Sequence, residues 1–200
     1  MTLLEQAKDI IIVQESARLF FARSINGVTI KDIAQAVGVG EATVYRRYKT
    51  KYNLVLAVAN YFQKKIVGDY FQIDPSKSGL ERLEKFYDAF LKIFQEQPDY
   101  FKFIKEFDAF VINSDDDEMD QYGEGILHFR DLFLEAYKAG LKDKTVRPIL
   151  EVENFYFATT HALMELCKKL AGDNIIPQDK ALDRSGEIKV LIETILYRLK

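Results

Sequence analysis

Apolar positions in the first part of the chain recur at three- and four-residue steps, the spacing of an amphipathic helix. Between Leu3 and Ala22 one such stripe runs through Ile10, Val13, Ala17 and Phe20. The pattern predicts a helix over residues 3–22, with its apolar stripe facing a core.

A second, shorter pattern follows over residues 29–51. Its apolar positions fall on one face of a short helix, and Gly38 comes directly after them, where a non-helical backbone angle costs least. Thr29 can cap that helix through its hydroxyl group, with Asp32 three residues on. The predicted inward positions are Ile30, Ile33, Ala34, Val37, Val39 and Val44. Two short helices with a polar and basic outside suit the major groove of DNA, but the spacing equally fits an ordinary helical hairpin.

The rest of the chain also reads as helices. The four prolines fall at predicted helix boundaries, and we find no extended alternating pattern that would indicate strands. We therefore predict an all-α fold of about nine helices, in which an N-terminal helix-turn-helix head precedes a C-terminal helical body. The further predicted helices cover residues 51–70, 80–95, 98–112, 119–140, 148–171 and 181–199.

From Ile10 to Val58 the chain resembles the N-terminal domain of the TetR family of bacterial regulators. The matching residues are Ala17, Leu19, Phe20, Thr29, Asp32, Ile33, Ala34, Gly38, Val39, Thr43, Val44, Tyr45, Tyr48 and Lys51 to Leu54. The chain departs from the family at Ser24 and Gly27, where a glycine and an aromatic residue are usual, and at Glu41 and Arg46-Arg47. Glu41 and Arg46-Arg47 fall where bases would be read, so these departures affect which operator sequence would be recognised.

The resemblance implies a helix-turn-helix DNA-binding domain at residues 1–50 and a helical ligand-binding and dimerisation domain at residues 51–200. It implies a homodimer that binds a near-palindromic double-stranded DNA operator. A small-molecule effector would release this dimer from the operator. The residues expected at the DNA are Thr29, Gly40, Glu41, Thr43, Tyr45, Arg46, Arg47 and Lys51.

These residues divide into two expected roles. Lys51 and Tyr45 are expected to hold phosphates, whereas Thr43 and Arg46 are the better candidates for base edges. Arg47 fits either role. Glu41 could accept from cytosine N4, or it could simply be an acidic residue favoured at a helix start.

The body is rich in aromatic residues, and the family typically leaves a cavity between its central helices. We expect a largely apolar effector there, although core packing is the commoner role for any one of these residues. The candidates are Phe103, Phe107, Phe110, Phe129, Phe133, Tyr137, Phe157, His161 and Met164. The last two helices are expected to pair with their copies in the dimer, through a stripe of Leu191, Ile195 and Leu199.

Charge and composition narrow the function further. Residues 1–52 contain 8 Lys+Arg and 5 Asp+Glu, which leaves 28 − 8 = 20 basic and 31 − 5 = 26 acidic residues for the rest of the chain. A basic head on an acidic body suggests that only the head meets DNA phosphate. The single cysteine, Cys167, excludes an intrachain disulfide and fits a cytoplasmic protein. The longest apolar run, Leu54 to Ala59, is too short to span a membrane.

We expect no metal, no cofactor and no catalytic residues. His128, His161 and Cys167 lack zinc-ligand spacing, and the acidic run from Ser114 to Asp120 is better explained as solvated surface than as a divalent-metal site. The main alternative is a TetR-like regulator without a small-molecule ligand, gated by a protein partner or constitutive. An all-α enzyme is a distant alternative, because no nucleophile motif or phosphate-binding loop is present.

Overall fold

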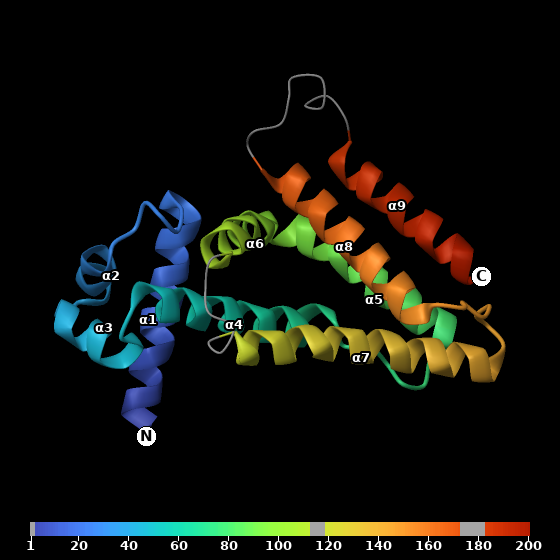
Figure 1. Ribbon diagram of the computed structural model, residues 1–200, viewed down its shortest axis with the longest axis horizontal. Helices are drawn as coiled ribbons and strands as arrows, with labels where there is room; N and C mark the ends of the chain where they lie inside the picture. The colour runs from blue at the N-terminus through green and yellow to red at the C-terminus, as the bar shows by residue number, and fades with distance from the viewer. Residues whose placement is uncertain (1–2, 113–118, 173–182) are drawn as a thin grey trace. The chain divides into compact units, whose positions relative to one another are not determined.

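The computed structural model describes residues 3–112, 119–172 and 183–200. Within these ranges the chain is helical and contains no strand, so the predicted all-α fold is confirmed (Figure 1). The helices are α1 (Leu3–Arg23), α2 (Ile30–Val37), α3 (Glu41–Tyr48), α4 (Lys51–Tyr70), α5 (Gly79–Glu96), α6 (Pro98–Val111), α7 (Asp120–Asp143), α8 (Val152–Ala171) and α9 (Arg184–Leu199). Most of the predicted acidic run at 114–120 and of the predicted helix break at 172–178 lies outside the described residues.

The chain packs as two compact units. Unit 1 contains residues 1–64 and 102–124, and unit 2 contains residues 65–101 and 125–200. Three helices, α4, α6 and α7, contribute residues to both units. The predicted boundary at residue 50 divides the chain by function, into a DNA-binding domain and a ligand-binding and dimerisation domain. This division stays a prediction.

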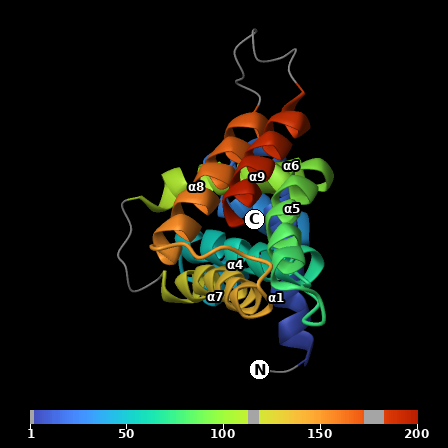
Figure 2. The ribbon, with the colours of Figure 1, turned by 90° about the vertical axis from the view of Figure 1, so that its right-hand side faces the viewer.

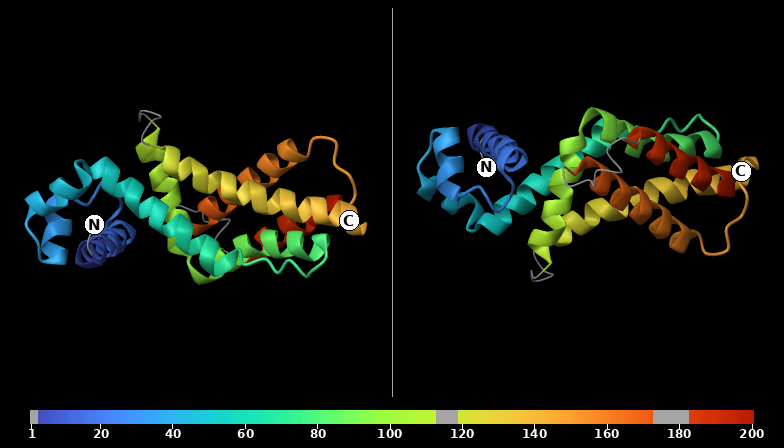
Figure 3. Two further views of the ribbon diagram at one scale, coloured as in Figure 1. Left: turned by 90° about the horizontal axis from the view of Figure 1, so that it is seen from below. Right: turned by 90° about the horizontal axis from the view of Figure 1, so that it is seen from above.

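Unit 1 has a small apolar core to which α1, α2 and α3 all contribute. Helix α2 lies against both α1 and α3, as both views in Figure 3 show. The α1 stripe begins two residues later than predicted: Ile12 is buried, whereas Ile10 is 49% exposed and its predicted place in the stripe is wrong. Ile30, Ile33, Ala34 and Val44 are buried as predicted.

Unit 2 is built around α5, α8 and α9, which pack on one another (Figure 2). Helix α8 was predicted to begin at Pro148, but it begins at Val152. The residues before Val152 form a loop that other elements hold through hydrogen bonds. In that loop, Arg147 N donates to Leu199 O at 2.8 Å and Ile149 N donates to Tyr137 Oη at 2.7 Å. Ile195 and Leu199 are buried within their own chain, so the predicted dimer stripe is wrong at these two positions.

The start of α5 passes very close to the end of α7. A Cβ atom added at Gly79 would lie 1.9 Å from Gly140 N and 2.7 Å from Ala136 O, and backbone atoms cannot yield as a flexible side chain can. Asp143 also accepts a hydrogen bond from Gly79 N at 2.8 Å, which holds the two elements together.

We expect Gly79→Ala to reduce the free energy of unfolding by about 1–3 kcal/mol, the usual cost of overpacking. Gly68→Ala is the matched control, because an added Cβ there meets nothing within 4 Å in the described structure. That change should stabilise α4 by about 0.5–1 kcal/mol through helix propensity. Urea unfolding of both variants measures the difference, and equal effects would contradict the close approach at Gly79.

Candidate nucleic-acid interface

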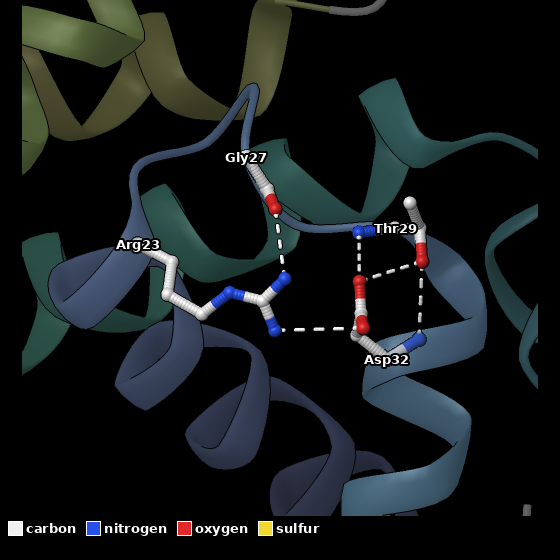
Figure 4. Close-up of polar contacts among 4 residues, drawn as sticks. All are labelled: Arg23, Gly27, Thr29 and Asp32. Carbon is white, nitrogen blue, oxygen red and sulfur yellow. Dashed lines mark hydrogen bonds and ion pairs between the residues drawn. The ribbon is translucent and has the colours of Figure 1, made fainter.

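The first helix of the motif starts on a complete capping box. Asp32 N donates to Thr29 Oγ1 at 3.2 Å, and Thr29 N donates to Asp32 Oδ2 at 2.8 Å (Figure 4). Hydrogen bonds from Thr29 are the main cause that lowers the pKa of Asp32. Arg23 adds an ion pair to Asp32 Oδ1 at 3.4 Å and donates to Gly27 O at 3.1 Å. The predicted Thr29 cap is therefore confirmed, and Arg23 joins it from the end of α1.

The turn between α2 and α3 depends on Gly38. This residue has φ 75°, in the left-handed region that favours glycine, as expected from the sequence. Gly38 N donates to Gln35 O at 3.2 Å and Val39 N donates to Ala34 O at 2.9 Å, which closes the end of α2. Gly40 then precedes α3 in an extended conformation and is exposed.

Helix α3 separates an exposed face from a buried one. Glu41, Tyr45 and Arg46 are exposed, with Tyr45 at 48%, whereas Val44 is completely buried and Thr43 is half-buried. Helical geometry places Glu41, Tyr45 and Arg46 within about 140° of one another around the helix axis. These three candidates therefore share one outward surface, with Thr43 at its edge.

The start of α4 lies directly after α3. Asn53 N donates to Thr50 Oγ1 at 3.1 Å, so Thr50 caps this helix. Lys51 is half-buried there; burial lowers the pKa of its ammonium group, and the carboxylate of Asp32 partly opposes that shift. Lys51 is the first residue of α4, whose first backbone N–H groups favour an anion.

Arg47 differs from the other candidates because its side chain turns toward α1. It forms an ion pair with Asp9, and its Nη1 also donates to Glu5 O at 3.3 Å. Tyr48 Oη donates to Asp9 O at 3.4 Å, and burial, with the nearby Asp9 charge, raises the pKa of Tyr48 to about 12. Asp9 could not be identified as a partner of Arg47 from the sequence, because nothing in one sequence connects two residues that lie 38 positions apart.

Residues 12–58 match the family model described as bacterial regulatory proteins, tetR family. The N-terminal domain of this chain belongs to the TetR family. The resemblance seen at Thr29, Gly38, Tyr45 and Lys51 is therefore confirmed.

One curated relative and two solved structures are similar to this chain beyond its N-terminal domain. The HTH-type transcriptional repressor KstR2 of Mycolicibacterium smegmatis is 25% identical over 156 residues, which span 72% of this chain and 70% of the relative. A regulator from Saccharomonospora viridis in complex with choline has a TM-score of 0.76 at 16% identity, with 98% of both chains covered. A TetR regulator from Haloarcula marismortui has a TM-score of 0.75 at 18% identity, covering 98% of this chain and 100% of that one. The two structures show that the TetR-family fold extends over the body.

The candidate ligand residues are divided between the two units. Phe103 and Phe107 are buried in unit 1, where Phe110 stacks on Tyr52 with ring centroids 6.1 Å apart. In unit 2, Phe133 and Tyr137 are buried and stack at 6.3 Å, and Phe129 contacts Phe71 at 4.9 Å. Phe157 and Met164 are half-buried, and His161 is exposed at 5.7 Å from the Phe157 ring.

Among the described residues no three His, Cys, Asp or Glu side chains gather closely enough to hold a metal ion. No helix in the described part of the chain is long and apolar enough to cross a membrane.

Proposed function

We propose that this TetR-family regulator binds double-stranded DNA through the exposed face of α3. The observation that carries the proposal is the outward surface of Glu41, Tyr45 and Arg46 on a short helix whose opposite side is buried through Val44. A helix of this kind enters the major groove, while flanking groups hold the phosphates. Thr29 and Lys51, at the starts of α2 and α4, are the proposed phosphate contacts, and Gly40 allows the backbone to approach the DNA.

Selection of bound sequences from a random DNA library tests this proposal directly. We expect a near-palindromic consensus whose two half-sites are about one helical turn apart. Recovery of no preferred sequence would rule out specific DNA binding. A consensus with one half-site would retain DNA binding but reject the dimeric arrangement.

Alanine variants should separate positioning contacts from base contacts. Lys51→Ala should weaken binding to all DNA alike and lower the salt slope by about one unit, because one phosphate loses its cation. Arg46→Ala should cost about 1–3 kcal/mol on the selected sequence and relax its preference at one position per half-site. Binding to selected and scrambled duplexes across a salt series measures both effects; equal losses on the two duplexes would make Arg46 a phosphate contact.

The regulator is further proposed to act as a homodimeric repressor. KstR2 is a repressor, and its similarity over most of both chains supports the same sign of regulation here. The adjacent helices α8 and α9 support a dimer, because α8 exposes small residues at Ala158 and Ala162 while α9 exposes Val190 and Tyr197. Exposed apolar side chains of this size gain stability when a second copy covers them.

A largely apolar small molecule is the proposed effector, bound within the aromatic part of the body. The support is the density of aromatic rings around Phe133 and the choline complex of the structurally similar regulator. The Tyr87 and Thr159 hydroxyl groups, 2.8 Å apart, provide a polar pair near those rings. Native mass spectrometry of the purified protein separates this proposal from a regulator without a ligand: a retained small molecule that weakens operator binding favours the effector.

A further inference from the structure

Arg47 occupies the protein-facing side of the recognition helix. Around α3 it lies about 60° from the buried Val44 and about 100° from the exposed Arg46. Its side chain is only 16% exposed, and that of Asp9, its ion-pair partner, is 28% exposed. Two consecutive arginines in the sequence therefore point to different surroundings.

The contacts of Arg47 connect the last turn of α3 to the first half of α1. Nη1 bridges the Asp9 carboxylate and the Glu5 carbonyl, and the next residue, Tyr48, donates to the carbonyl of Asp9. The Arg47 Nε is buried and has no hydrogen-bond partner among the described residues. This guanidinium group is committed to an intramolecular contact at the cost of one unsatisfied donor.

We propose that Arg47 is a positioning residue, which fixes the orientation of α3 against α1 through Asp9 and makes no contact with DNA. The inference rests on the proposed DNA binding by α3. Its consequence is that Arg46 alone of the two arginines reads or holds the operator. Asp9, at the other end of the ion pair, becomes a determinant of operator recognition although it is acidic.

The alternative is that Arg47 leaves Asp9 to reach a phosphate. That movement would strand a partly buried carboxylate without its cation, next to a polyanion. It would also release the contact that orders the last turn of α3. Arg46 already offers an exposed guanidinium group one residue away, so the DNA gains a cation there without this cost.

The sign of the Asp9 effect separates the two possibilities. Removing a negative charge from a DNA-binding head should strengthen binding to any DNA if charge alone matters. If Asp9 serves to position α3, its removal should instead weaken binding to the selected sequence. The test therefore compares Arg47→Gln, Asp9→Asn and the double variant with wild type, and uses Arg46→Gln as the matched control.

Each protein is titrated with the library-selected duplex and with a scrambled duplex of equal length, across a salt series and well below its melting temperature. We expect each single variant at Arg47 or Asp9 to lose about tenfold affinity for the selected duplex, the scale of one charge-assisted hydrogen bond. The loss on scrambled DNA should be smaller and the salt slope unchanged. The double variant should bind no worse than either single variant, because both changes break one contact.

Three results would overturn the positioning role. A salt slope lowered by about one unit in Arg47→Gln, with neutral or tighter binding by Asp9→Asn, makes Arg47 a phosphate contact. Lower melting temperatures with an unchanged ratio of selected to scrambled affinity reduce the ion pair to a stability effect. No change in any variant removes the role entirely. Failure of the proposed function looks different, since wild type itself would then prefer no sequence, and the positioning role would fail with it.

Discussion

Replacing Val190 and Tyr197 together by glutamate is expected to convert the proposed dimer into a folded monomer and to reduce operator affinity by about a hundredfold or more. The two side chains are 63% and 80% exposed in the single chain, and their seven-residue separation places them on the same face of α9. A negative charge at both positions would have to be buried without a partner in the dimer. Loss of the second head then makes each half-site a separate binding event.

These two positions give a cleaner test than the stripe expected from the sequence. Ile195 and Leu199 are buried inside their own subunit, so glutamate there would unfold the chain and say nothing about the dimer. Val190 and Tyr197 make little packing contact within the monomer, because both side chains are mostly exposed. Their substitution should break no packing within the subunit. The circular dichroism spectrum and the urea midpoint of the monomer should therefore stay unchanged.

Leu150→Glu is the control, because Leu150 is also apolar and is 95% exposed, but lies in the loop before α8. Sedimentation velocity should show a dimer for the control and a monomer for the Val190→Glu/Tyr197→Glu variant. If the double variant sediments as a dimer and binds the operator as wild type does, the dimer does not use this face of α9.

Local sequence signals predicted the elements of this fold well. Thr29 and Gly38 each act within four residues along the chain, through a cap or a turn, and both behave as expected. The start of α8 was wrong because it depends on distant partners. Arg147 and Ile149 are held by Leu199 and Tyr137, so the chain forms a loop after Pro148 where local preference would allow a helix.

The candidate site shows the same limit. Periodicity and resemblance identified α3 and its exposed residues, but they left the role of Arg47 open between base and phosphate. In the structure Arg46 is exposed and Arg47 is turned toward α1, and only the folded chain connects Arg47 with Asp9. The distinction depends on a charge contributed by another helix, which neither the composition nor the spacing of α3 contains.

Aromatic residues of the body raise a related difficulty for the effector site. An exposed pocket residue and a core residue look identical in sequence, because both are large and apolar. In the structure Phe133 is completely buried, with the rings of Tyr156 at 5.2 Å and Phe86 at 5.7 Å from its own. Its first role is therefore to fill the core of unit 2, whether or not it also touches an effector.

Phe133→Ala is accordingly expected to lower the free energy of unfolding by about 3–5 kcal/mol, because it removes a buried ring from a packed aromatic cluster. The matched control is Phe157→Ala on α8, whose ring is half-buried and should cost clearly less. Urea unfolding followed by circular dichroism measures both. Near-equal effects would mean that the surroundings of Phe133 collapse onto the space or that a cavity already exists there. In that case Phe133 would be a wall of the effector site, and Phe133→Leu, which keeps most of the volume, should change effector response while leaving stability nearly intact.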